Sequence, residues 1–151
     1  MNEEQEQEQT SKELHLVVFR LGSEEFAVDI NSIREIIRYP KITNVPNTDD
    51  YIVGVINLRG QITTVMSLRK RFRMEDVETS EETRVLIVDI GSEHIGLIVD
   101  GVSEVLKVDG ENLVDGEDMG SDTYGQYVSG MIKLDKRLII LLDLIKAFKK
   151  S

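Results

Sequence analysis

Several features that carry chemistry or cross membranes are missing from this sequence of 151 residues. It has no cysteine, which excludes disulfides, thiol catalysis and thiolate metal sites. Its longest uninterrupted apolar run, residues 138–142, is far shorter than the roughly 20 residues that a transmembrane helix needs. The 18 Lys and Arg fall short of the 28 Asp and Glu, and the net charge is −10. Nonspecific nucleic-acid binding requires a surplus of cations that displace counterions, so the composition argues against it.

The chain has enough apolar residues to form a core, except in its first residues. Hydrophobic residues make up 40% of it, as in globular domains. Residues 1–13 contain five Glu, one Lys and no apolar residue after Met1, so we expect a disordered acidic tail of net charge −4. Residues 14–150 should form one domain, or two small subdomains that share a core. A cytoplasmic protein is the simplest interpretation.

The body of the chain repeats itself, first at an offset of 69 positions. Residues 16–24 (LVVFRLGSE) match residues 85–93 (VLIVDIGSE) along their whole length. Further on at the same offset, Glu35 falls on Glu104 and three apolar neighbours match as well. Internal similarity of this length indicates a duplicated structural unit.

A second block of the repeat matches at an offset of 76. Seven identities link residues 51–72 to residues 127–148 in the same order. The seven additional residues of the second copy lie in a polar stretch, 109–125, as expected for an insertion in a surface loop. We therefore expect a first repeat at about 14–73 and a second at about 83–150.

Each repeat is predicted to consist mainly of short β-strands. Residues 14–21 and 25–30 are rich in Val, Leu, Ile and Phe, and Gly22 suits the tight turn between them. A second hairpin is expected over residues 52–66, with its turn at residues 59–60. Closing each sheet would remove its exposed edges. The expected fold class is therefore all-β, with two small barrels that share an interface and whose first strands could cross between the repeats.

Short helices are expected between and after these strands. Residues 31–38 should form one or two helical turns, because Ser32 and Glu35 have the spacing of a capping box. The equivalent stretch of the second repeat, residues 101–107, is richer in Val, and helix and strand both remain open there. Each repeat should close with a short helix, and the N-cap candidates are Ser67 and Asp143.

No constellation of residues predicts catalysis, a cofactor or a metal site. The sequence has no nucleophile elbow, zinc-protease motif, P-loop or dinucleotide-binding motif. His15 and His94 do not correspond in the repeat and have no second ligand nearby, so each is expected to be an ordinary strand or turn residue. The second repeat carries an acidic loop that lacks the EF-hand spacing for calcium. Its acids are Asp109, Glu111, Asp115, Glu117, Asp118 and Asp122.

Binding surfaces are better supported than chemistry. Arg59 is expected at a hairpin tip, whereas its repeat counterpart is Asp135, so the scaffold itself does not require Arg there. A planar guanidinium on a rigid turn is a good anchor for a carboxylate of a partner. The first repeat also ends in a basic cluster, opposite in sign to the acidic loop, which could orient association or be an ordinary solvated surface. Its members are Arg69, Lys70, Arg71 and Arg73.

Five motifs in this order resemble the CheW family of bacterial and archaeal chemotaxis coupling proteins. They are residues 26–30 (FAVDI), 33–36 (IREI), 54–60 (GVINLRG), 68–72 (LRKRF) and 99–106 (VDGVSEVL). Together with the internal repeat, they extend the resemblance over residues 14–150. The chain departs from the family at Ser67, where Asp is common. This departure puts in doubt any partner contact made by a carboxylate at that position.

The resemblance implies a fold of two five-stranded SH3-like β-barrels. It also implies a non-enzymatic adaptor that joins the histidine kinase CheA, through its CheW-like regulatory domain, to the cytoplasmic tip of methyl-accepting chemoreceptors. The expected location is cytoplasmic, at receptor arrays on the inner face of the membrane, without insertion into it. Carried over by motif, Glu35 and Arg59 are the expected partner contacts. The surrounding surface would be shaped by Ile33, Ile36, Asn57, Leu58 and Gly60.

Two other classes of function stay open. A small β-barrel that binds single-stranded nucleic acid would use aromatic platforms beside a basic groove. The eight Phe and Tyr, several at predicted core positions, and the net charge of −6 that remains outside the tail count against it. A hydrolase would need two carboxyl groups of different pKa in a deep pocket. The sequence selects no such pair.

Overall fold

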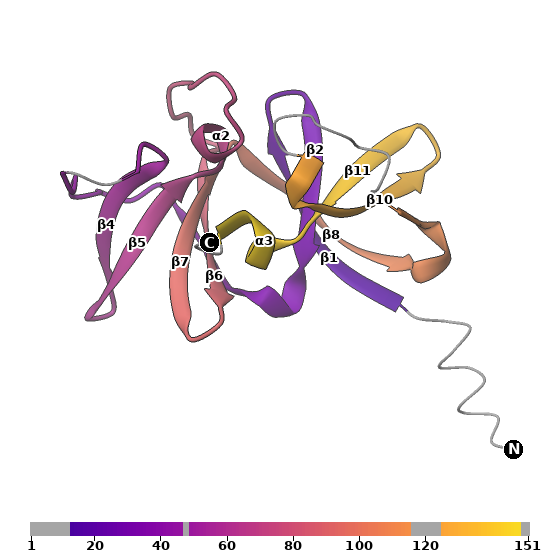
Figure 1. The fold of residues 1–151 in the computed structure, drawn as a ribbon, viewed down its shortest axis with the longest axis horizontal. Coiled ribbons are helices and arrows are strands. Elements are labelled where there is room, and N and C mark those ends of the chain that lie inside the picture. Colours follow the sequence, from indigo (N-terminus) through magenta and orange to yellow (C-terminus); the bar gives the residue numbers. More distant parts are fainter. Residues whose placement is uncertain (1–12, 47–48, 116–124, 149–151) are drawn as a thin grey trace, which may run out of the picture.

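Two small β-barrels lie next to each other in the computed structural model, which describes residues 13–46, 49–115 and 125–148 (Figure 1). The elements of the first repeat are β1 (Glu13–Leu21), β2 (Glu24–Asp29), the 3-10 turn η1 (Ile30–Ser32), β3 (Ile33–Arg38), β4 (Ile52–Leu58), β5 (Gln61–Ser67) and α2 (Leu68–Arg71). Those of the second are β6 (Arg84–Ile90), β7 (Glu93–Val99), β8 (Gly101–Asp109), η2 (Gly110–Asn112), β9 (Leu113–Asp115), η4 (Gly125–Tyr127), β10 (Val128–Leu134), β11 (Arg137–Leu142) and α3 (Leu144–Phe148).

Each barrel combines strands from both repeats. The first barrel has the strand order β3-β6-β7-β5-β4, and the second has the order β8-β1-β2-β11-β10-β9. The opening hairpin of each repeat therefore completes the sheet of the other repeat. One strand of each hairpin pairs antiparallel with that sheet, β1 with β8 and β6 with β3, and the other pairs parallel with it, β2 with β11 and β7 with β5. Neither repeat contains a complete sheet, so the two barrels depend on each other.

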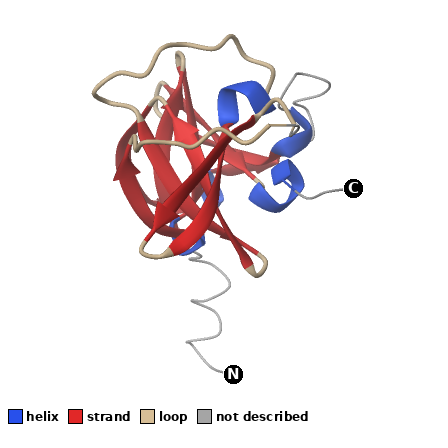
Figure 2. Cartoon of the chain, turned by 90° about the vertical axis from the view of Figure 1, so that its left-hand side faces the viewer, coloured by secondary structure: helices blue, strands red, loops and turns tan. Residues whose placement is uncertain are grey.

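The uninterrupted apolar runs at the start of each repeat belong to strands that are buried on both faces. Along β1, Leu16 and Val18 pack inside the second barrel, whereas Val17 and Phe19 belong to a different cluster, between the barrels. Strand β6 repeats this alternation between the interior of the first barrel and the same shared cluster. Figure 2 shows the strands curving into barrels, with most of the helical turns to one side of them.

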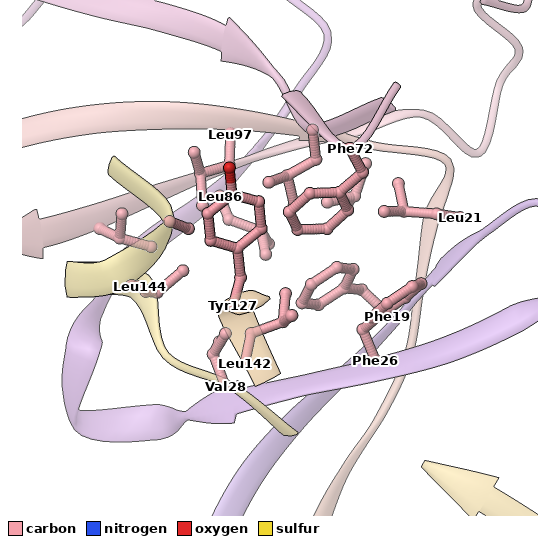
Figure 3. Packing of buried hydrophobic residues seen from close by; sticks show 14 of the residues in the cluster. Phe19, Leu21, Phe26, Val28, Phe72, Leu86, Leu97, Tyr127, Leu142 and Leu144 are labelled. Carbon is pink, nitrogen blue, oxygen red and sulfur yellow. The ribbon is translucent and has the colours of Figure 1, made fainter. Parts of the chain in front are cut away.

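The largest apolar cluster lies between the barrels and is called the shared core here. It is built from β1, β2, β6, β7, β10, β11, α2, η4 and α3. Phe72 is fully buried in it. Its ring lies 5.9 Å from that of Phe26 and 5.6 Å from that of Tyr127, so aromatic side chains of both repeats meet there (Figure 3). The shared interface that the repeat predicts is therefore the main core of the molecule.

The side chain of Arg71 also joins the two repeats. The Arg71 guanidinium lies 4.9 Å from the ring of Tyr51 and 4.8 Å from that of Tyr127, the repeat counterpart of Tyr51. Its Nε donates to the carbonyl of Ala147 at 2.7 Å. Cations held between aromatic faces are stabilised by the ring quadrupoles. This member of the predicted basic cluster is thus engaged inside the molecule and is not available as a free charge.

The helix expected over residues 31–38 is wrong. The chain makes only the 3-10 turn η1, where the Asp29 side chain accepts a hydrogen bond from the Asn31 amide at 2.8 Å, and then continues as strand β3. β-branched Ile is favoured in strands, and β3 pairs with β6 along its length, so tertiary pairing overrides the capping-box spacing. The equivalent stretch of the second repeat, left open by the sequence, is also a strand, β8.

Both predicted N-caps are confirmed. The Ser67 hydroxyl accepts from the Lys70 amide at 3.2 Å, and the Asp143 carboxylate accepts from the Lys146 amide at 3.1 Å. Each cap satisfies an amide that the first turn of its helix leaves without a partner.

The expected tail and the acidic loop lie mostly outside the described residues. Glu13, assigned to the tail, is instead the first residue of β1, and residues 1–12 are not described. Asp109, the first acid of the loop, caps η2 by accepting from the Glu111 amide at 3.0 Å. Residues 116–124 of that loop are not described. Within the described ranges, no helix is long and apolar enough to cross a membrane.

A partly buried ion pair joins α2 to the turn between β7 and β8, and this turn also contacts the turn of the first hairpin. The Arg69 Nε donates to the Asp100 carboxylate at 2.9 Å, and the Gly22 amide donates to the same carboxylate at 2.7 Å. Burial by itself raises the pKa of Asp100, but the hydrogen bonds from Arg69 and Gly22 outweigh it and hold the pKa below its ordinary value of 3.8. The ionised form is therefore the one that stabilises the fold.

Replacing Asp100 with Asn should lower the free energy of unfolding by about 2 kcal/mol at pH 7, because hydrogen bonds to a charged group are lost. A carboxyl whose folded pKa is depressed contributes its full stability above the unfolded pKa and loses it as pH falls through the folded value. The difference from wild type should therefore be constant above about pH 5 and shrink below about pH 4. Urea unfolding across pH tests this, with Glu82→Gln, in a more exposed ion pair, as a control of small effect.

Candidate partner-binding site

The hairpin between β4 and β5 holds Arg59 at the tip of a two-residue turn. Arg59 and Gly60 have φ angles of 52° and 85°. Two positive φ values are typical of a type I′ turn, which matches the twist of the flanking strands. The Asn57 side chain accepts a hydrogen bond from the Gly60 amide at 2.9 Å and fixes the turn. Asn57 and Gly60 therefore act on the position of Arg59 through the backbone.

Arg59 forms an ion pair with Glu35 of strand β3. The Arg59 Nη2 lies 2.8 Å from the Glu35 Oε2, and the arginine side chain remains 80% exposed against 22% for the glutamate. The sequence interpretation of Glu35 as a helix cap is wrong, since it is a strand residue. An exposed ion pair contributes little to stability. Its effect is to hold the guanidinium in place while leaving its outer face open to a partner carboxylate.

A cavity, called the Arg59 cavity here, lies beside this ion pair. It has a volume of about 300 Å³ and brings together three predicted site residues, Glu35, Leu58 and Arg59. It is also lined by Arg34, Gln61, Thr63, Ile87 and His94. Ile33 and Ile36 are not among its lining residues: Ile33 packs against the shared core, and Ile36 is 40% exposed on β3.

A β-bulge in β3 adds polar residues to this cavity that the sequence did not indicate. Ile33 pairs with Val88 and Glu35 with Ile87, so Arg34 is an extra residue without its own partner in the ladder. Its Nε donates to the Asp89 Oδ1 at 2.9 Å, and the His94 Nδ1 lies 2.5 Å from the same oxygen. Bulges often re-aim a side chain in this way next to a functional site.

The second repeat contains a matching bulge with a different outcome. Ser103, the counterpart of Arg34, is the extra residue of β8. The following Glu104 pairs with Arg137 at 2.9 Å, and Arg137 also pairs with Glu25 on β2 at 2.9 Å. In this repeat the arginine ties three strands of the second barrel together. In the first repeat Arg59 has a single carboxylate partner among the described residues, which leaves more of it available.

A second concave surface lies between the barrels and is called the interbarrel groove here. It has a volume of about 330 Å³, with an apolar floor and carboxylates that belong to Asp29, Asp89 and Asp143. Its apolar lining consists of Leu14, Leu16, Val28, Leu141, Leu142, Leu144 and Ile145. An apolar groove of this kind fits the apolar face of an amphipathic helix. Ile145 of α3 is 59% exposed at its edge.

Among the described residues, no group of three His, Asp or Glu is arranged to hold a metal ion. The aromatic side chains are mostly committed to the core: Phe19, Phe26, Phe72 and Tyr127 are buried. These four rings are not available as stacking platforms for single-stranded nucleic acid.

These features match proteins of one family. A family model described as CheW-like domain matches residues 15–151. The chain is 36% identical over 130 residues to the chemotaxis protein CheW of Klebsiella aerogenes, covering 86% of this chain and 78% of that protein. It is 30% identical over 128 residues to the chemotaxis protein CheW of Bacillus subtilis, covering 85% and 82%.

A solved structure agrees with the sequence matches. The scaffolding protein TtCheW from Thermoanaerobacter tengcongensis superposes with a TM-score of 0.85 and 35% sequence identity, covering 93% of this chain and 95% of that one. The fold and these matches thus define a chemotaxis scaffold protein with two SH3-like subdomains. The chain belongs to the CheW family.

Proposed function

We propose that this chain is a non-enzymatic adaptor that couples methyl-accepting chemoreceptors to the histidine kinase CheA in a ternary complex. The regulatory domain of CheA docks on the face that carries Arg59 and Glu35. The cytoplasmic tip of a receptor, a helical segment, lies with its apolar face in the interbarrel groove. The complex forms in the cytoplasm, at receptor arrays on the inner face of the membrane.

The observation that carries this proposal is the presentation of Arg59. Its side chain is 80% exposed, yet the turn and Glu35 fix its position. A fixed planar donor can bind a carboxylate with two parallel hydrogen bonds and loses little conformational entropy when it does so. Leu58, which lines the same cavity, adds apolar contact area beside it.

An adaptor of this kind needs two surfaces and no reacting groups. It changes kinase activity only by binding the active and inactive arrangements of its partners with different affinity. Each contact can be weak, because many receptors and kinases held in one array supply avidity. The two barrels support this function by holding the Arg59 face and the groove in one rigid frame, the shared core.

Replacing Arg59 with Ala should weaken binding to the CheA regulatory domain roughly tenfold, about 1.4 kcal/mol, because the anchor for a partner carboxylate is lost. The free energy of unfolding should stay within about 0.5 kcal/mol of wild type, as for other surface changes. Calorimetric titration and urea unfolding measure the two quantities separately.

The matched control for this variant is Asp135→Ala. Asp135 occupies the equivalent hairpin tip with the same φ of 52°, so both substitutions place Ala at the same positive φ. The control should bind the CheA domain like wild type. Unchanged affinity of Arg59→Ala, or an equal loss in both variants, would show that the Arg59 face is not the docking site.

A further inference from the structure

One carboxylate connects the interbarrel groove to the Arg59 cavity. Asp89 lines the groove, and its Oδ1 accepts from Arg34 and contacts His94, both of which line the Arg59 cavity. Within the described part of the chain, no hydrogen bond reaches the other carboxylate oxygen, Oδ2. The Asp89 side chain is 38% exposed, so a cation in the groove can reach its carboxylate. Asp89 therefore belongs to both candidate sites at once.

The described charged residues that line the groove are all acidic. Its lining includes three carboxylates, and no Lys, Arg or His is found among its described lining residues. Asp29 and Asp143 each use one oxygen to cap a short helical turn. An amphipathic helix that fills this groove gains most when Lys or Arg flanks its apolar face, because these cations neutralise the carboxylates at the rim.

Arg34 is placed to change partners. It is the bulge residue of β3, so the ladder does not depend on it, and its side chain is 55% exposed. In the free chain it pairs with Asp89. When it leaves Asp89 it can donate to a carboxylate bound beside Arg59, since both arginines line the same cavity. Two guanidinium groups would then hold one acidic partner group.

We propose that Asp89 couples the two partner sites. A lysine or arginine of the helix in the groove competes with Arg34 for the Asp89 carboxylate, and the released Arg34 joins Arg59 in binding an acidic side chain of the second partner. The inference rests on the proposed function, because it takes the receptor tip as the helix and the CheA regulatory domain as the acidic partner. The coupling is reciprocal: each partner raises the affinity of the chain for the other by the same factor.

The test measures the affinity of the whole chain for the CheA regulatory domain by calorimetric titration, with and without a saturating receptor-tip fragment. We expect the fragment to raise the affinity about fivefold in wild type. In Asp89→Asn the ratio should fall to about one, because the neutral side chain no longer attracts either cation. Arg34→Gln should likewise lower the ratio to about one, because the guanidinium that moves from Asp89 to the acidic partner group is missing.

Asp143→Asn is the matched control. It removes the same charge from the groove, and Asn still caps α3, but the ion-pair partner of Arg34 is Asp89 and not Asp143. This variant should bind the receptor fragment more weakly than wild type and keep the fivefold ratio. Thermal unfolding of each variant establishes that all of them are folded.

The outcomes separate this inference from the proposed function. A fivefold ratio that persists in Asp89→Asn, or its loss in Asp143→Asn as well, overturns the coupling role of Asp89. Wild-type chain that binds both partners with a ratio of one also overturns it, and leaves the adaptor proposal standing. Wild-type chain that fails to bind one of the partners overturns both.

Discussion

Phe72→Ala should lower the free energy of unfolding by about 3–5 kcal/mol, which is the usual cost of removing a fully buried aromatic ring. Phe72 is completely buried at the point where aromatic rings of both repeats meet. The rings of Phe26 and Tyr127 would face a void that their strands and turns cannot close without shifting both barrels. A domain of this size has a total stability of only about 5–15 kcal/mol, so the loss is a large fraction of it.

Urea unfolding measures this effect, and Phe148→Ala is the control. Phe148 is the repeat counterpart of Phe72, but it is only partly buried at the edge of the same cluster. Its replacement should cost clearly less. Because the core is shared, Phe72→Ala should also weaken binding at the Arg59 face and in the interbarrel groove together. Equal costs for the two variants would contradict the assignment of Phe72 to the centre of the core.

Gly54→Ala should lower the free energy of unfolding by about 3 kcal/mol, the upper end of what an overpacked site usually costs. A Cβ at Gly54 would lie 2.1 Å from the carbonyl oxygen of Thr43 and 2.8 Å from the Ile42 Cγ2. Thr43 and Val55 exchange two backbone hydrogen bonds, of 2.9 and 2.8 Å, beside this point. The added methyl group would push this backbone apart and open the contact between β4 and the segment that follows β3.

The equivalent change in the second repeat, Gly130→Ala, is the matched comparison. A Cβ there would meet the end of the Leu113 side chain at 2.8 Å and the Val114 carbonyl oxygen at 3.0 Å. A side-chain end can rotate away, whereas a backbone oxygen held in a bridge cannot, so Gly130→Ala should be the milder variant. Thermal and urea unfolding of both proteins provide the measurement. A Gly54→Ala protein as stable as wild type would rule out the close backbone approach.

The repeat explains how much of the fold was predictable. Matching apolar blocks predict the duplicated strands and the shared interface, and Gly54 and Gly130 stand out as identities before their close contacts are known. The crossing of hairpins between barrels was only a possibility, because the offset shows which strands are equivalent and not which ones pair. The prediction of a helix at residues 31–38 was wrong for the same reason, since pairing with β6 decides the conformation of this segment.

The candidate site was predictable in part as well. Arg59 departs from its repeat counterpart, and this departure directs attention to the hairpin tip. Arg34, Asp89 and His94 depend on a bulge and on three strands meeting, which no local pattern encodes. The signal that could have found them is a change of chemistry between the repeats, because Asp89 and His94 fall on Arg20 and Glu25. Such differences indicate positions that the common scaffold does not need.

The central claim is that one rigid chain binds two partners at the same time on separate surfaces. Size-exclusion chromatography with light scattering, applied to the chain mixed with the CheA regulatory domain and a receptor-tip fragment, tests this claim most directly. The account predicts a single species whose mass is the sum of all three components. When the chain carries Arg59→Ala, this species should lose the CheA domain. Two binary complexes that displace each other, with no ternary species at any concentration, would contradict it.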